Sequence, residues 1–243
     1  MHYERLNGRA WNEKREVVIT PNFITSAAGS CLIATGQTRV ICTASVEEKV
    51  PQFLENSGMG WLTAEYSMLP GSTSTRTSRE KSSGSGRTHE IQRLIGRSLR
   101  AALDRKKLGL RTITIDCDVI QADGGTRTAS ITGGFVALSI AIQKLMQKGL
   151  IRQNPIVHEV AAISLGKVIG NLLLDLNYIE DSSAEIDANL VATPEAEIIE
   201  WQTTAERALL PLAEMNGMLE LGMKGIRELV ELQRAAIAQA TAE

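Results

Sequence analysis

Apolar and polar positions change period several times along the chain, which indicates a mixture of strands and helices. Residues 111–120 alternate strictly, with Ile113, Ile115 and Val119 on one side and threonines and aspartates on the other, so we predict a half-buried strand. In residues 88–105 the apolar side chains recur every three or four positions, as on one face of a helix. Residues 128–148 are apolar over most of their surface, which predicts a buried helix.

The remaining elements follow from shorter runs. Strands are expected over 17–19, 31–34, 39–45, 61–66, 160–166, 172–176, 187–193 and 198–202, and a final helix over 205–242 that Gly217 and Gly222 interrupt. Strands separated only by a short turn, such as Thr35-Gly36-Gln37, indicate hairpins. Together the elements predict an α+β fold of stacked helix and strand layers, in one domain spanning residues 1–243.

The composition indicates a soluble protein of the cytoplasm that contacts no membrane. With 43% hydrophobic residues the chain can bury a sizeable core. No uninterrupted apolar run reaches the roughly 18 residues of a membrane helix, and residues 128–143 are judged too short and too rich in Ser, Thr and Gly. The first residues form no apolar signal region, and Cys31, Cys42 and Cys117 lack C-x-x-C spacing, so we expect buried free thiols.

Positive charge is concentrated in one stretch. Between Leu69 and Arg111 eleven Lys and Arg face three acids, a local net charge of +8, so the rest of the chain carries −10. Such asymmetry suggests a basic surface for a polyanion on an acidic body. Residues 70–86 are rich in Ser, Thr and Gly, and we expect a mobile surface loop there. That loop is either a plain linker or an RNA-facing loop, and it carries Arg76, Arg79 and Lys81.

A glycine-rich turn stands between the predicted strand and the buried helix. It reads Asp123-Gly124-Gly125-Thr126-Arg127. Glycines allow the backbone to approach a ligand, the first N–H groups of a helix have no internal partner, and arginine adds a fork of donors. We therefore predict an anion cradle (Gly125, Thr126 and Arg127) for phosphate, with a plain turn as the alternative. The chain lacks the P-loop pattern of nucleotide triphosphatases.

Carboxylates gather about 55 residues further on, in the segment 180–187. In an extended chain Glu185 and Asp187 fall on one side, and Asp181 can turn back toward them. Magnesium needs only one or two carboxylates together with phosphate oxygens and water, so we predict a Mg2+ site at Asp181 and Asp187. A merely solvated acidic loop is the alternative.

Four segments resemble the ribonuclease PH family, the phosphate-dependent exoribonucleases also called tRNA nucleotidyltransferases. They are 60–70 (GWLTAEYSMLP), 90–100 (EIQRLIGRSLR), 121–133 (QADGGTRTASITG) and 178–189 (YIEDSSAEIDAN). The resemblance runs from about residue 7 to the C-terminal helix. It implies a fold like the second domain of ribosomal protein S5 and a homo-hexamer arranged as a trimer of dimers. It also implies an activity: phosphate attacks the 3′ end of tRNA precursors and releases nucleoside diphosphates, reversibly.

The resemblance also implies roles for individual residues. Phosphate would be bound by Arg87 and the cradle, and the magnesium-linked catalytic aspartates would be Asp181 and Asp187. Asp181 would either hold the metal or donate the leaving-group proton, and the sequence leaves this open. Candidates for gripping RNA phosphates, or for the ring interface, are Arg76, Arg79, Arg93 and Arg97. A solvated basic face is the plainer interpretation of the last two.

Some positions depart from the family pattern, which usually has arginine at Gly71 and glycine at Thr203 and Arg207. These departures put the backbone after residue 200 in question but leave the phosphate and aspartate motifs intact. Two other functions remain open. One is a non-catalytic RNA-binding ring subunit, as in exosome-like assemblies, and the other is a hydrolytic nuclease that uses the same acids with water.

Overall fold

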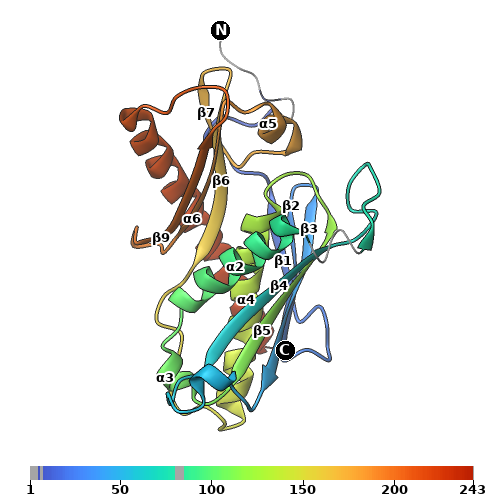
Figure 1. Cartoon of the computed structure of the whole chain (residues 1–243), viewed down its shortest axis with the longest axis vertical. Coiled ribbons are helices and arrows are strands. Elements are labelled where there is room, and N and C mark those ends of the chain that lie inside the picture. Colours follow the sequence, from blue (N-terminus) through green and yellow to red (C-terminus); the bar gives the residue numbers. More distant parts are fainter. Residues whose placement is uncertain (1–4, 6–7, 80–84, 243) are drawn as a thin grey trace.

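Two β-sheets occupy the two ends of the long axis of the molecule (Figure 1). The computed structural model describes Arg5, residues 8–79 and residues 85–242, so Lys81 lies outside the described residues. The first sheet has the order β1 (Val17–Pro21), β2 (Gly29–Thr35), β3 (Thr38–Glu47), β5 (Thr112–Gln121), β4 (Trp61–Met68). The second has the order β7 (Asn171–Leu174), β6 (Ala161–Val168), β8 (Ile186–Ala192), β9 (Ile198–Ala205). Neighbouring strands are antiparallel except β4 and β5, which are parallel.

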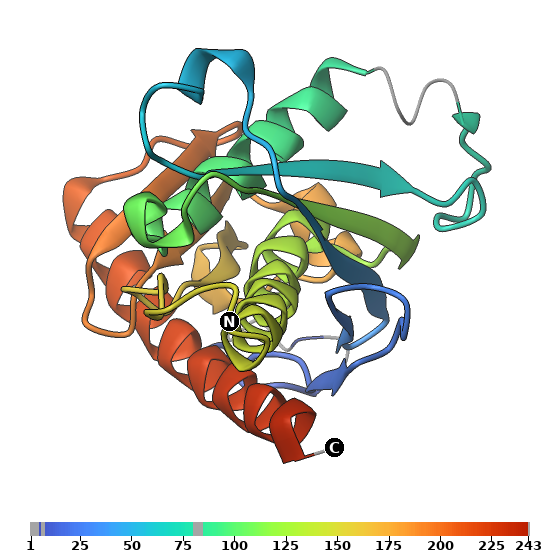
Figure 2. The ribbon, with the colours of Figure 1, turned by 90° about the horizontal axis from the view of Figure 1, so that it is seen from below.

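Helix α4 (Thr126–Gln147) forms the centre of the molecule. It packs across β2 and β3 and also contacts β6 and α6 (Leu212–Ala242), as the view from below shows (Figure 2). Helix α2 (Gly86–Ala101) covers β4 and contacts α4. The shorter helices given by the described residues are η1 (Gln52–Leu54), α3 (Arg105–Leu108) and α5 (Tyr178–Ser183). The predicted α+β layers are therefore confirmed.

Helix α4 is longer than the uncharged run of residues 128–143 that the sequence shows. Among the described residues it alone is long and apolar enough to cross a membrane, by length and composition. However, 83% of its most apolar window is buried inside the protein. Burial against both sheets explains the apolar surface, which makes α4 a core helix.

Sequence periodicity located the buried faces correctly. On β5 the side chains of Ile113, Ile115, Cys117 and Val119 are at most 1% exposed, as the alternation predicts. The apolar stripe of α2 is buried in the same core, and all three cysteines are buried free thiols. Local period therefore fixed which face of each element packs inward.

Two predicted helices have different bounds in the structure. The helix expected over 88–105 ends at Ala101, because the Asp104 backbone N–H bonds to the Pro155 carbonyl and the Asp104 side chain caps α3. The helix expected over 205–242 begins at Leu212, because β9 continues to Ala205 and Pro211 follows. Helix α6 runs through Gly217 and Gly222 without a break, so that expectation was also wrong.

Of the two unusual residues after position 200, one lies in a strand and the other follows it. Thr203 pairs with Ala188 in the β8–β9 ladder, in a part of regular register. The Arg207 backbone N–H bonds to the Glu185 carbonyl, and its guanidinium donates to the carbonyls of Ser182 and Ser183. Arg207 thus supplies donors to the last carbonyls of α5, which a glycine could not do.

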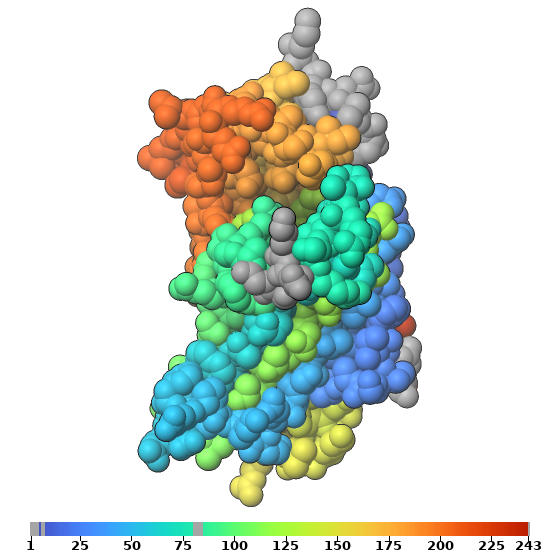
Figure 3. Space-filling model, turned by 45° about the vertical axis from the view of Figure 1, so that its right-hand side comes forward, coloured from blue at the N-terminus to red at the C-terminus, as the bar shows by residue number. Residues whose placement is uncertain are grey.

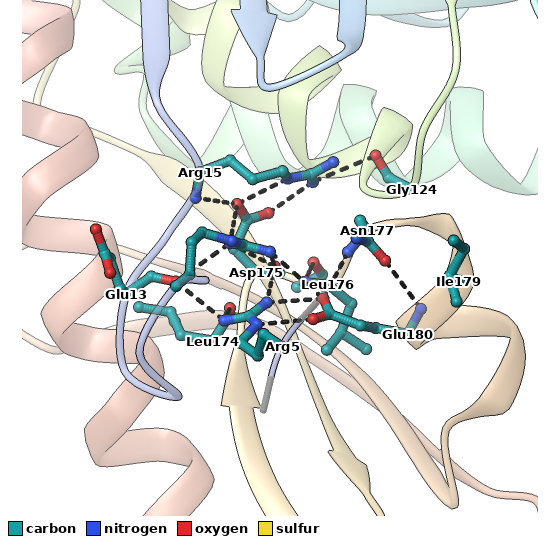
Figure 4. A network of polar contacts seen from close by, with 12 residues as sticks. Arg5, Glu13, Arg15, Gly124, Leu174, Asp175, Leu176, Asn177, Ile179 and Glu180 are labelled. Atoms are coloured by element: carbon teal, nitrogen blue, oxygen red, sulfur yellow. Dashed lines mark hydrogen bonds and ion pairs between the residues drawn. The ribbon is translucent and has the colours of Figure 1, made fainter. Parts of the chain in front are cut away.

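A buried arginine network joins the N-terminal segment to the second sheet (Figure 4). It consists of Arg5, Arg9, Arg15, Asp175 and Glu180. Arg15 donates through Nε and Nη2 to the Asp175 carboxylate, at 2.9 and 2.7 Å, and Arg5 holds Glu180 through two hydrogen bonds of 2.7 Å. Arg15 also donates to the carbonyl of Asp123 at the start of the glycine turn. One cluster of charges therefore fixes both the glycine turn and the start of α5.

Ion pairing with arginine, more than burial, determines the pKa values of Asp175 and Glu180. Burial alone would raise the pKa of Asp175, but the hydrogen bonds and charge of Arg15 outweigh it and lower the pKa below its usual value. Arg5 lowers the pKa of Glu180 in the same way against the effect of burial. Both carboxylates are therefore ionised at neutral pH and need their arginines.

We predict that Arg15→Ala lowers the free energy of unfolding by about 3–5 kcal/mol, because the buried Asp175 carboxylate would lose its closest partner and keep only the longer contact with Arg9. Urea unfolding at pH 7 measures this loss. Arg234→Ala breaks exposed ion pairs with Glu159 and Glu231 and serves as the control, with a much smaller loss. Equal losses in the two variants would show that burial of the network contributes nothing.

Candidate active site

The glycine turn opens helix α4 with its backbone donors exposed to a ligand. Gly124 and Gly125 both have positive φ angles, of 74° and 67°, which side-chain-bearing residues adopt only with strain. Gly125 is the N-cap residue, and no side chain caps the first N–H groups of α4. The predicted cradle therefore lies at a helix N-terminus, where partial positive charge favours an anion.

Gly124 brings the cradle against the segment that leads into α5. A Cβ atom at this position would lie 2.7 Å from the Leu176 carbonyl oxygen and 2.7 Å from the Asn177 carbonyl carbon. The Tyr178 backbone N–H donates to Asp123 Oδ1 across the same contact, at 3.2 Å. Only glycine permits this approach, so the cradle and the acidic segment form one site.

Each side chain of the cradle has a dedicated partner. The Thr126 hydroxyl is 2.9 Å from the hydroxyl of Tyr66 on β4. The Tyr66 residue is only 4% exposed. Arg127 donates through Nη1 to Gln202 Oε1 on β9 at 2.9 Å. The first sheet thus holds Thr126 and the second sheet holds Arg127.

Helix α5 positions the acidic segment, where the sequence analysis expected only a loop. Asn177 and Glu180 form a reciprocal capping box, in which the Asn177 side chain accepts from the Glu180 N–H and Glu180 accepts from the Asn177 N–H. This pattern of Asn followed three residues later by Glu was visible in the sequence and could have predicted the helix. Asp181 follows Glu180 within this fixed turn.

Two of the four acids in segment 180–187 face each other, namely Asp181 and Asp187, which we call the acid pair. Burial, then the negative charge of Asp181, raises the pKa of Asp187 to about 6. Burial also raises the pKa of Asp181. The other two acids turn away, since Glu180 binds Arg5 and Glu185 accepts from the Gly170 N–H. The expectation that Glu185 joins Asp187 was therefore wrong.

Two arginines act electrostatically on the acid pair. The charges of Arg127 and Arg87 both act to lower the pKa of Asp181 against the effect of burial, so both lie within range of its carboxylate. The same two arginines act on the buried Tyr66 hydroxyl. Glu206 adds a further negative charge near both aspartates, and the sequence analysis missed it because it comes from the end of β9. The structure thus gathers Arg87, the cradle and the acid pair in one place.

The remaining basic candidates have different surroundings. Arg76, Arg79 and Arg93 are exposed, whereas Arg97 is bound to Glu200 by two short hydrogen bonds. The segment before the uncertain residues (teal) and α2 (green) lie beside one another on one face, with the second-sheet segments above them (Figure 3). Arg100, three residues after Arg97 on α2, instead stacks on Trp61 and donates to the Leu62 carbonyl.

The acid pair can hold a hard divalent cation only if further ligands, such as phosphate oxygens and water, complete its coordination. Within the described residues no group of three or more His, Cys, Asp or Glu side chains forms a metal cage. The acid pair supplies two neighbouring carboxylates whose pKa values are raised first of all by burial, and in Asp187 also by the charge of Asp181. Two carboxylates completed by phosphate oxygens and water are the arrangement that Mg2+ prefers, so the pair fits that ion.

Comparison with known proteins identifies the family. Residues 13–142 match domain 1 of the 3′ exoribonuclease family, and residues 158–225 match domain 2. The chain belongs to the 3′ exoribonuclease family. It is 56% identical to Ribonuclease PH of Bacillus pumilus, over 97% of this chain and 98% of that protein. It is 54% identical to Ribonuclease PH of Crocosphaera subtropica, over 99% of this chain and 100% of that one.

Solved structures share the fold of this family member. Rice Rrp46 superposes with a TM-score of 0.78 at 20% identity, covering 96% of this chain and all of that one. A chain of the Archaeoglobus fulgidus exosome, determined with RNA bound to the active site, superposes with a TM-score of 0.81 at 21% identity, over 94% of this chain and 92% of that one. At such identities the likeness establishes the fold alone.

We predict that Asp187 of the metal-free protein titrates near pH 6 and that Asp181→Asn moves this titration to lower pH. The substitution removes the neighbouring negative charge that opposes ionisation of Asp187. Carbon NMR of labelled carboxyl groups measures both values. Glu185→Gln is the control and leaves the titration in place, because Glu185 faces Gly170. An unchanged Asp187 titration in Asp181→Asn would show that the two carboxyls do not interact.

Proposed function

We propose that this chain is a phosphate-dependent 3′-to-5′ exoribonuclease that trims the 3′ ends of tRNA precursors. The observation that carries the proposal is the meeting of two arginines, an open helix N-terminus and two aspartates in one place. The Ribonuclease PH relatives at 54–56% identity over nearly their whole length support it. We further propose that the two matched family domains act as one unit with this single site.

Phosphate binding is assigned to the positive half of the site. Arg87, Arg127, the Thr126 hydroxyl and the first backbone N–H groups of α4 would donate to the phosphate oxygens. Phosphate already carries nucleophilic oxygens, so no side chain has to become a nucleophile. The protein instead has to hold two mutually repelling anions, phosphate and the RNA terminus, at reacting distance.

The reaction exchanges one phosphorus–oxygen bond for another. A phosphate oxygen attacks the phosphorus of the last phosphodiester, and the bond to the 3′ oxygen of the preceding nucleotide breaks. The products are a nucleoside 5′-diphosphate and an RNA one nucleotide shorter, whose 3′ oxygen takes up a proton. The reverse exchange extends RNA, which explains the nucleotidyltransferase activity implied by the family resemblance.

The acid pair would hold Mg2+, with phosphate oxygens and water as further ligands. Bound there, the ion would stabilise the charge that develops on the transferred phosphoryl group and the leaving oxygen. The raised pKa of Asp187 also makes this carboxyl a candidate proton donor. Either role requires Asp181 and Asp187 to remain adjacent, which the capped α5 and strand β8 provide.

We assign the RNA contacts to four arginines, and we propose that the chain assembles into a ring. Arg76, Arg79, Arg93 and Arg97 would track phosphates without reading bases, as suits an exonuclease. Engagement of Arg97 would require its release from Glu200. We propose a homo-hexamer, built as a trimer of dimers and active in the cytoplasm.

A product assay tests the proposed reaction. Incubation with a tRNA precursor, Mg2+ and inorganic phosphate should release nucleoside diphosphates, and omission of phosphate should stop the release. Nucleoside monophosphates formed without phosphate would identify a hydrolytic nuclease instead. Bound but undegraded RNA would identify a non-catalytic ring subunit.

We predict that Arg127→Ala raises the KM for phosphate by about 10- to 100-fold, the loss expected for charge-assisted hydrogen bonds. RNA affinity should fall far less, because Arg127 is assigned to the phosphate nucleophile. Initial rates at varied phosphate, together with RNA binding by anisotropy, measure the two effects. Arg234→Ala on α6 is the matched loss of one exposed arginine and should change neither.

We predict that Asp187→Ala lowers kcat by about 10²–10⁴-fold while RNA still binds, because the acid pair acts on the reacting atoms and not on RNA affinity. Glu185→Ala, two residues away in the same segment, should retain most activity since its carboxylate faces Gly170. Single-turnover rates and anisotropy separate the two effects. Substantial turnover by Asp187→Ala would remove this residue from the reaction.

A further inference from the structure

The phosphate cradle already contains a carboxylate. Glu90 Oε1, on α2, lies 3.7 Å from Arg127 Nη1. We propose that Glu90 is an internal anion that occupies the phosphate-binding side of Arg127 and that phosphate displaces it on binding. This inference rests on the proposed function and concerns how that site controls its affinity for phosphate.

Gln202 links the carboxylate to the arginine. Its Oε1 accepts from Arg127 Nη1 at 2.9 Å, while its Nε2 donates to Glu90 Oε1, also at 2.9 Å. One amide therefore fixes both members of the ion pair, and it reaches them from β9, in the second sheet. The arrangement gives Arg127 a defined position before any ligand arrives.

Glu90 is also next to the second arginine assigned to phosphate. It stands three residues after Arg87 on α2, so the two side chains lie on the same face of that helix. A phosphate bound between Arg87 and Arg127 would therefore meet the Glu90 carboxylate as a like charge. Binding has to move this carboxylate aside or protonate it.

Exposure shows which partner can move. The Arg127 side chain is 17% exposed and stays anchored by Gln202, whereas the Glu90 side chain is 46% exposed. Rotation of Glu90 into water costs little, because a partly exposed ion pair is weak. The Glu90 carboxylate thus competes with phosphate for Arg127. It lowers the apparent affinity for phosphate but does not block the site.

An internal anion also keeps Arg127 available. The acid pair attracts the same arginine, since the charge of Arg127 acts on both Asp181 and Asp187. Glu90 and Gln202 attract it toward α2 and β9. Arg127 is therefore attracted by two acidic groups, and its pair with Glu90 is partly exposed, so phosphate can contact it without first breaking a buried pair.

Calorimetric titration with inorganic phosphate, in the presence of Mg2+, tests the proposal without RNA. Glu90→Gln keeps the shape of the side chain and removes its charge. We expect the dissociation constant for phosphate to fall about two- to fivefold, the strength of a partly exposed ion pair. Glu48→Gln removes one charge from the exposed pair with Arg111 and should leave the constant unchanged.

A second variant separates displacement from simple orientation. Gln202→Leu should raise the dissociation constant for phosphate, because Arg127 loses its anchor, so the two variants move it in opposite directions. In turnover, Glu90→Gln should lower the KM for phosphate with kcat retained. A constant that rises or stays the same in Glu90→Gln would overturn the internal-anion role while leaving the proposed function intact. Absence of phosphate binding by the unaltered protein would overturn both.

Discussion

Buried charge pairing is the interaction on which the site depends. Asp175 is 3% exposed and Glu180 1%, and an ionised carboxylate at such depth persists only with a partner. Arg15 and Arg5 provide these partners from the N-terminal segment, and Arg15 also bonds to the carbonyl of Asp123. The glycine turn and α5 are therefore fixed by charges that take no part in the chemistry. A mutation of Arg5 or Arg15 would therefore act on the site through geometry.

The site itself is a contact between opposite charges that are only partly neutralised. The charge of Arg127 acts on Asp187, yet the pKa of Asp187 is still raised to about 6, because burial and the charge of Asp181 outweigh this cation. Such a site can bind a further cation and a further anion. The aspartates can accept a cation and the arginines an anion, which is what a reaction between two phosphate groups requires.

The sequence predicted what depends on local period and failed where distant contacts decide. The buried faces of β5 and α2 follow from alternation and helical spacing, and both are confirmed. The end of α2 at Ala101 could not be predicted, because Asp104 pairs with Pro155, fifty residues away. The turn of Glu185 toward Gly170 and the approach of Glu206 to the acid pair also arise from sheet pairing. Helix α5 was missed although its capping box is local.

The two sides of the proposed phosphate site differ in burial. This difference indicates which side can move when phosphate binds. Thr126 and Arg127 begin the core helix α4, most of which is buried, and the Arg127 side chain is also held by Gln202. Arg87 and Glu90 are exposed on the first turns of α2. Movement on binding should therefore occur on the α2 side, toward a cradle that stays fixed. A displaceable carboxylate at Glu90 fits this arrangement. Glu90 lies on the exposed start of α2, and it contacts Arg127, whose side chain is held by Gln202.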